Sequence, residues 1–175
     1  MSEAYSIYGA REDSEVSIPT CTEILYLTDC KFSEFPDIPK NMRKLFLENV
    51  EVSNNSPIVL PESLESLYVG YGCKGVSNLI KEYPQGLKEL EYRKCGRGQL
   101  PPLPPSLKVL RLTRDGFEEY ASELPPRLEV LDLFESGWTT LPDLPSSLKE
   151  LNIWGMDMER LPSIGDNVKS DLFLL

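Results

Sequence analysis

Residues 141–153 read LPDLPSSLKELNI, and this L-P-x-L-P-x-x-L-x-x-L-x-L pattern recurs with variations from residue 18 almost to the C-terminus. The proline before each L-x-x-L-x-L segment recurs at intervals of 20, 22, 23, 20, 21 and 20 residues. These prolines are Pro19, Pro39, Pro61, Pro84, Pro104, Pro125 and Pro145. A motif repeated at so short a period predicts a solenoid with one coil per repeat.

The alternation within L-x-L places its two apolar residues on one face of a strand and the residue between them on the other. One such strand cannot bury its apolar face alone, so successive coils should stack into a parallel sheet with strands about 4.8 Å apart and a core behind them. Proline lacks the N–H that a ladder requires, so the L-P-x-L-P segments should form the opposite, convex side. The predicted fold is an α/β leucine-rich-repeat solenoid with a parallel concave β-sheet and a helix-poor convex side of extended, polyproline-II-like segments. Side chains expected to close the core from the convex side are Phe32, Phe35, Phe117, Tyr120, Trp138, Leu141 and Leu161.

The chain is expected to form a single leucine-rich-repeat domain over residues 1–175. Residues 1–17 are predicted to be an N-terminal cap or a mobile segment, and residues 18–163 to be seven repeats. Residues 164–175 are predicted to be a degenerate last coil or a C-terminal cap, in which Gly165 stands where the repeat has proline.

Little helix is expected. Residues 77–82 are predicted to carry one helical turn with Ser77 or Asn78 as its cap, and residues 115–122 are a similar candidate. The chain stops on LFLL at residues 172–175, an apolar end that either folds over the last coil or mediates self-association.

The chain has a net charge of -10, from 18 basic and 28 acidic residues, and no histidine. It therefore lacks the usual general base at neutral pH and the histidine-based metal and triad motifs. Residues 70–75 are glycine-rich, but they follow a predicted strand in register and are interpreted as a loop. We expect no enzyme activity, no catalytic residue, no cofactor and no metal site. The acidic balance also argues against nucleic acid and membrane partners, although basic residues gather around Arg93 and Arg111.

No apolar run approaches the roughly 20 residues that span a bilayer, and residues 1–17 lack the apolar centre of a secretory signal. Residues 100–105, LPPLPP, are either a ligand for SH3 or WW domains or part of the repeat, like the matching segments elsewhere. The cysteines lack C-x-x-C spacing and are interpreted either as reduced thiols or as including one disulfide pair. They are Cys21, Cys30, Cys73 and Cys95. These features fit a cytoplasmic protein, or one delivered to a host cytosol by a signal-independent route.

Residues 103–112, LPPSLKVLRL, resemble the short repeats of bacterial secreted leucine-rich-repeat effectors and of effector-type ubiquitin ligases from enteric pathogens. The resemblance covers about residues 18–165 and implies a module that binds a host or substrate protein, without the separate catalytic domain of the ligases. Those repeats carry asparagine shortly after the strand, where its amide satisfies backbone groups along the stack. The corresponding positions here are Cys30, Val50, Gly72, Cys95, Asp115, Ser136 and Met156. A continuous asparagine ladder is therefore not expected.

The outward-facing strand residues should line up across the concave face, because neighbouring parallel strands keep one register. The position between the two strand leucines holds Tyr26, Phe46, Tyr68, Glu91, Arg111, Asp132 and Asn152. The position after the second leucine adds Arg93, Phe134 and Trp154. Exposed aromatic residues flanking arginine are typical of binding hot spots. The alternative is that the aromatic residues only stabilise neighbouring strands and the charges form a solvated ladder.

The sequence thus predicts a non-catalytic interaction module that binds another protein on its concave sheet, as an effector or a regulatory adaptor. The alternative function is a structural protein that self-associates through its apolar C-terminal edge. The first hypothesis allows a monomer and the second requires a homodimer or larger assembly.

Overall fold

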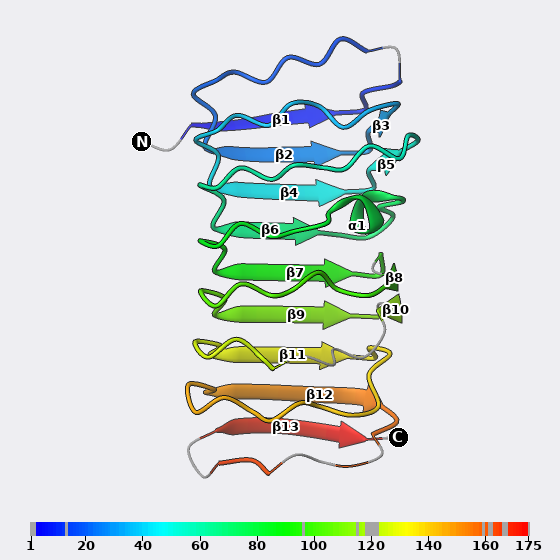
Figure 1. The fold of residues 1–175 in the computed structure, drawn as a ribbon. Coiled ribbons are helices and arrows are strands. Elements are labelled where there is room, and N and C mark those ends of the chain that lie inside the picture. Colours follow the sequence, from blue (N-terminus) through cyan, green and yellow to red (C-terminus); the bar gives the residue numbers. More distant parts are fainter. Residues whose placement is uncertain are drawn as a thin grey trace.

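The computed structural model describes residues 3–12, 14–95, 97–114, 116–117, 123–158, 160, 163–165 and 168–174. Within these residues, one sheet of nine parallel strands runs the length of the molecule in the order β1-β2-β4-β6-β7-β9-β11-β12-β13 (Figure 1). The strands are β1 (Ala4–Tyr8), β2 (Ile24–Thr28), β4 (Lys44–Glu48), β6 (Ser66–Val69), β7 (Glu89–Arg93), β9 (Val109–Thr113), β11 (Val130–Phe134), β12 (Glu150–Met156) and β13 (Lys169–Leu174). The return segments cross one face of this sheet (Figure 1). The predicted leucine-rich-repeat solenoid is confirmed.

Short elements lie where the strands end, at the right of Figure 1. Strand β3 (Lys31–Phe32) pairs with β5 (Glu51–Val52), and β8 (Arg97–Gly98) pairs with β10 (Gly116–Phe117), both in parallel. The single turn of helix α1 (Val76–Leu79) is the only α-helix within the described residues.

The helical turn predicted near residue 77 is present, but the predicted cap is wrong. Helix α1 has Gly75 at its N-cap and no side-chain cap hydrogen bond, and Ser77 lies inside the turn. Gly75 has a φ of +82°, and a Cβ atom there would lie 2.9 Å from the carbonyl oxygen of Val52. Close packing against the preceding coil, rather than capping chemistry, therefore fixes where the helix begins. The second predicted helical turn is wrong at Gly116 and Phe117, which form β10; the rest of that turn lies outside the described residues.

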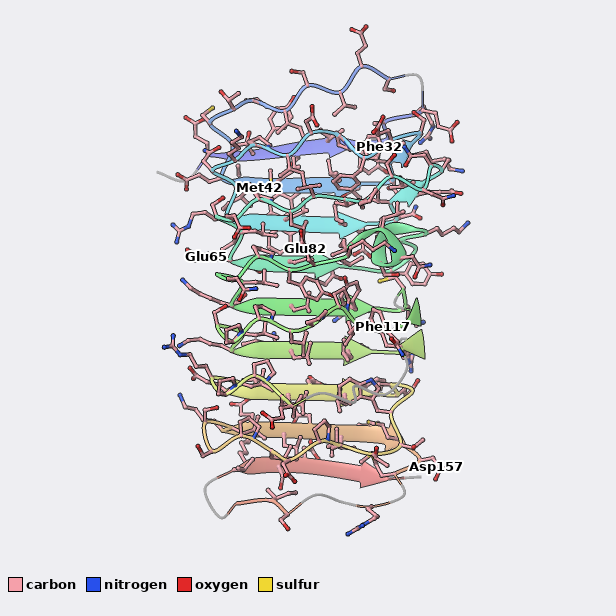
Figure 2. All side chains as sticks on the ribbon, in the orientation of Figure 1. Phe32, Met42, Glu65, Glu82, Phe117 and Asp157 are labelled. Atoms are coloured by element: carbon pink, nitrogen blue, oxygen red, sulfur yellow. The ribbon has the colours of Figure 1, made fainter. Side chains whose placement is uncertain are left out.

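The core lies between the sheet and the returns. In the seven strands of the large sheet from β2 to β12, the second and fourth residues are buried, as the L-x-L alternation predicts. On the convex side Phe32, Phe117 and Trp138 are also buried, and Figure 2 shows Phe32 and Phe117 close to the short strands. Phe35 and Leu141 are partly buried against this core. The remaining two convex residues of the prediction, at positions 120 and 161, lie outside the described residues.

Each proline of the repeat makes the turn that leads into a strand. The amide three residues later donates to the proline carbonyl at 2.9–3.1 Å in all seven repeats. In the last segment the amide of Val168 donates to the carbonyl of Gly165 at 3.0 Å, so the same turn forms without proline. Strand β13 follows and pairs with β12, with Leu172 opposite Ile153 and a shift in register after Trp154.

The coil of β6 contains one extra residue, which moves a predicted position. Glu51 pairs with Lys74, and the amide of Lys74 donates to Val50. Because Lys31 pairs with Glu51, the residue equivalent to Cys30 and Val50 is Cys73. The assignment of Gly72 to this position was therefore wrong, since counting from the proline misses the inserted residue.

Searching the described residues reveals no helix that is long and apolar enough to cross a membrane.

Candidate protein-binding surface

The predicted outward residues do form aligned rows on the sheet. The strand register places Tyr26 opposite Phe46 and Phe46 opposite Tyr68. The rings of Tyr26 and Phe46 are stacked, with centroids 4.7 Å apart and planes 10° apart, and those of Phe46 and Tyr68 are tilted at 6.1 Å. Tyr26 remains 40% exposed. The structure thus joins these three side chains into one aromatic cluster, which we call the N-terminal aromatic cluster.

Tyr68 is half-buried, whereas Tyr26 is exposed, and Gly70 leaves room for the Tyr68 ring. A Cβ atom on Gly70 would lie 2.6 Å from Tyr68 Cε1 and would also collide with the carboxylate of Glu48. Burial is the main cause that raises the pKa of Tyr68 to about 12, and the nearby carboxylate of Glu48, to which the phenol is hydrogen bonded, raises it further. Tyr68 therefore presents a neutral phenol held against its neighbours, rather than a freely exposed aromatic ring.

Charged side chains occupy the centre of the surface. Arg93 Nη2 lies 3.5 Å from Glu91 Oε1 on the same strand. The register places Arg111 between Glu91 and Asp132, and all three are half-buried. The structure brings these predicted residues together as a central charged group.

The carboxyl group of Asp132 is half-buried within this group. Burial raises its pKa above the usual range. A hydrogen bond from Asn152 and the positive charge of Arg111 act in the opposite direction but do not cancel the effect of burial. A carboxylate in such a position favours a partner that supplies a hydrogen-bond donor over one that only covers it.

A second aromatic pair lies beyond the charged group. The rings of Phe134 and Trp154 are 6.0 Å apart and nearly parallel, at 26°, and Trp154 is 44% exposed. The guanidinium of Arg114 lies 5.3 Å from the centre of the Phe134 ring. Its Nη2 also donates to Glu135 Oε1 at 3.0 Å. This C-terminal aromatic pair is therefore supported by a cation held in place from the neighbouring coil.

Three contributors to the surface were not among the predicted site residues. Glu48 and Arg114 act through Tyr68 and Phe134, as described above. Tyr8 is 77% exposed at the end of β1, opposite Thr28. A signal for Tyr8 was present, because Tyr5-x-Ile7 repeats the strand alternation 20 residues before Leu25-x-Leu27. No comparable sequence signal marks the cation–π contact of Arg114.

Metal-binding chemistry is not apparent on this surface. The described part of the chain contains no group of three or more histidine, cysteine, aspartate or glutamate side chains that could hold a metal ion. All four cysteines carry thiols: Cys21 is exposed, Cys95 is half-buried, and Cys30 and Cys73 are buried.

Comparison with known proteins finds a likeness among solved structures. No protein-family model matches the chain, and no curated protein matches it. Among solved structures, YopM from Yersinia enterocolitica WA-314 is similar, with 20% sequence identity and a TM-score of 0.48. The match covers 91% of this chain and 43% of the YopM chain, so this chain spans less than half of the length of that neighbour.

Proposed function

We propose that the concave sheet binds another protein and that the chain works as a non-catalytic interaction module. The observation that carries this proposal is the exposure of Tyr26 and Trp154, at 40% and 44%, on the same sheet face at either side of the central charged group. Large aromatic side chains that stay exposed on an ordered surface are the residues that gain most from burial by a partner.

The arrangement also indicates what the partner must supply. Tyr26 and Trp154 lie on β2 and β12, which are six strand spacings apart in the sheet order. At about 4.8 Å per spacing this is roughly 29 Å along the sheet. A partner that contacts both aromatic groups must therefore be about as long as a 20-residue helix. Between them it should offer polar groups to Arg111 and Asp132, because leaving half-buried charges without partners weakens binding.

The biological setting remains part of the proposal. The resemblance of residues 103–112 to bacterial effector repeats supports a role as an effector or regulatory adaptor. On that basis the module would act in the cytoplasm or in a host cytosol.

The test begins with affinity capture of a partner, followed by measurement of the affinity of the purified pair. The Tyr26→Ala/Trp154→Ala double variant should bind more than tenfold more weakly, because two hot-spot aromatic residues are lost. The matched control is Val59→Ala. Val59 is 80% exposed in the return segment between β5 and β6, so it is an exposed apolar residue away from the sheet face. Equal weakening by the control, or unchanged binding by a folded double variant, would contradict the proposal.

Self-association is the second candidate. Strand β13 is an edge of the nine-stranded sheet, and an open edge can pair with another chain. The side chains of Leu172, Phe173 and Leu174 lie outside the described part of the structure. Light scattering across a wide concentration range separates the two candidates, since a strictly monomeric species would remove self-association.

A further inference from the structure

A row of residues runs along the solenoid just after the left-handed corner that follows each strand. Its described members are Ala10, Cys30, Val50, Cys73, Cys95, Ser136 and Met156. We call this the corner row. Backbone hydrogen bonds fix its first part, since Lys31 donates to Ala10, Glu51 donates to Cys30 and Lys74 donates to Val50. Neighbouring members contact each other through their side chains, as Ser136 Oγ lies 3.6 Å from Met156 Sδ.

Cys73 and Cys95 are consecutive members of the corner row. The Cys95 thiol donates to the carbonyl oxygen of Val69 at 3.0 Å, and Val69 ends strand β6 in the coil that contains Cys73. The Cys95 sulfur therefore reaches back to the coil of Cys73. Cys30 contacts the preceding coil in the same way, with its sulfur 3.6 Å from the carbonyl oxygen of Ile7.

Two further observations bring the thiols together. Both line one hollow of about 490 Å³, whose wall also includes Tyr71 and Lys94. Burial raises the pKa of Tyr92 above its usual value, and Cys73 and Cys95 both add to that rise. Both sulfur atoms therefore lie near the same buried phenol.

We propose that Cys73 and Cys95 are a site of disulfide formation that joins the coil of β6 to the coil of β7. The strands of these two coils pair as far as Val69 and Tyr92 at the usual spacing of about 4.8 Å, and the Cα atoms of disulfide-bonded cysteines lie roughly 4.4 to 6.8 Å apart. The hollow gives a small oxidant access to the pair. This inference does not depend on the proposed binding function.

The oxidant is a low-molecular-weight disulfide such as oxidised glutathione. Cys95 is the more accessible thiol, so its thiolate attacks one sulfur of the oxidant, forms a mixed disulfide and releases one glutathione thiolate. Cys73 then loses its proton to solvent and attacks the Cys95 sulfur, which releases the second glutathione. Two protein thiols are oxidised to one disulfide, and one glutathione disulfide is reduced to two thiols. Burial raises the pKa of Cys73 to about 11, so little of this thiol is ionised at neutral pH and Cys95 makes the first attack.

The other two cysteines provide controls. Val50 separates Cys30 from Cys73 in the corner row, so these two residues are about 9.6 Å apart at two coil spacings, too far for a disulfide. Cys21 is exposed and is able to link separate molecules, so the experiment uses a Cys21→Ser background.

The Cys21→Ser protein is incubated with oxidised glutathione, alkylated and digested with trypsin without reduction. Cleavage gives residues 45–74 and residues 95–97 as separate peptides that each contain one cysteine. We expect these peptides to be joined, and to remain joined when Cys30→Ser is added. Adding Cys73→Ser or Cys95→Ser should abolish the product. Two results would overturn the proposal: glutathione retained on Cys95 without the joined peptides, or a disulfide that links Cys30 to one of the two cysteines instead. Either result can be seen in the Cys21→Ser protein without further substitutions.

Discussion

Ser106 ties two coils together at the turn that precedes a strand. Its hydroxyl lies 2.6 Å from the carbonyl oxygens of both Gln85 and Leu87 in the preceding coil. Ser63, two repeats earlier, makes the equivalent contacts with Lys40 and Met42. Ser147, two repeats later, donates to the carbonyl oxygen of Leu128. The serine two residues after the proline thus donates a hydrogen bond to carbonyl groups of the preceding coil, which would otherwise lack a partner.

Removing this hydroxyl should weaken the fold by a measurable amount. We expect Ser106→Ala to lower the free energy of unfolding by about 1 kcal/mol, because one buried carbonyl loses its hydrogen bond. Urea denaturation followed by circular dichroism provides the measurement. Ser146→Ala, at an exposed serine in the coil of β12, is the control and should change stability by only a few tenths of a kcal/mol. Equal effects of the two substitutions would contradict this role.

Gly86 occupies the same position in the coil of β7, one of the coils that lack this serine. A Cβ atom on Gly86 would lie 3.6 Å from the carbonyl oxygen of Glu62, which is ordinary contact. A serine there should reach the carbonyl groups of the coil before it, and replacing glycine also reduces the freedom of the unfolded chain. We expect Gly86→Ser to raise the free energy of unfolding by about 0.5 to 1 kcal/mol. Gly86→Ala separates the two effects, because alanine reduces the freedom of the unfolded chain but cannot form the hydrogen bond.

At the scale of the strands, most of the fold could be predicted from two regularities. Apolar residues alternate with outward-facing residues within a strand, and the whole repeat recurs every 20 to 23 residues along the chain. These regularities depend on which residues are buried, so Leu110 and Leu112 could be placed in the core from sequence alone. The inserted residue before Gly72 could not be located, because one extra loop residue leaves the flanking pattern unchanged. Strand β1 was predicted only as a cap or mobile segment, since its Tyr5-x-Ile7 alternation lacks the leucines that define the other strands.

The rows of the candidate surface were equally predictable, because strand register decides which outward residues are neighbours. What each side chain does within a row could not be predicted. Tyr68 bends over Gly70 onto Glu48, and that outcome depends on how the Tyr68 and Glu48 side chains share the space that glycine leaves open. Gly70→Ala tests this packing, because the added methyl group must displace the Tyr68 ring. We expect tyrosine fluorescence to change while far-ultraviolet circular dichroism stays the same, and an unaltered Tyr68 environment would refute it.

Central and terminal strands should differ in how much their inward residues contribute. Leu110 is fully buried in β9, between two neighbouring strands, whereas Ile7 is half-buried in the edge strand β1. We expect Leu110→Ala to lower the free energy of unfolding by about 3 kcal/mol, and Ile7→Ala to lower it by about 1 kcal/mol because less apolar area is lost. Urea denaturation of both variants gives the comparison. A larger loss for Ile7→Ala would mean that the first coil is buried by something that the described residues do not contain.

Across the whole molecule, a row of charged side chains follows the amino ends of the strands, where Figure 2 labels Glu65. The row consists of Glu23, Arg43, Glu65, Lys88, Lys108, Glu129, Lys149 and Lys169. Glu65 lies 2.8 Å from Arg43 and 3.1 Å from Lys88. Glu129 is held in the same way by Lys108 at 2.8 Å and by Lys149. Because Glu65 and Glu129 each join three successive coils, this row stabilises the stacking of coils rather than any one coil.

These ion pairs should make the stability of the solenoid depend on pH. Hydrogen bonds from Lys108 and Lys149 lower the pKa of Glu129 from 4.5 to about 2. A carboxyl group with a lowered pKa in the folded state contributes stability above its unfolded pKa and loses it as the pH falls through the folded value. We therefore expect Glu129→Gln to be less stable than the unmodified protein at pH 7, with a difference that shrinks between about pH 4.5 and pH 2. Thermal unfolding at closely spaced pH values measures this difference. The control is Glu62→Gln. Glu62 is exposed and the described residues show no ion pair for it, so this substitution should not produce a stability difference that shrinks between these pH values. A Glu129→Gln effect that stays constant down to pH 2 would mean that the stabilisation comes from side-chain packing rather than from charge.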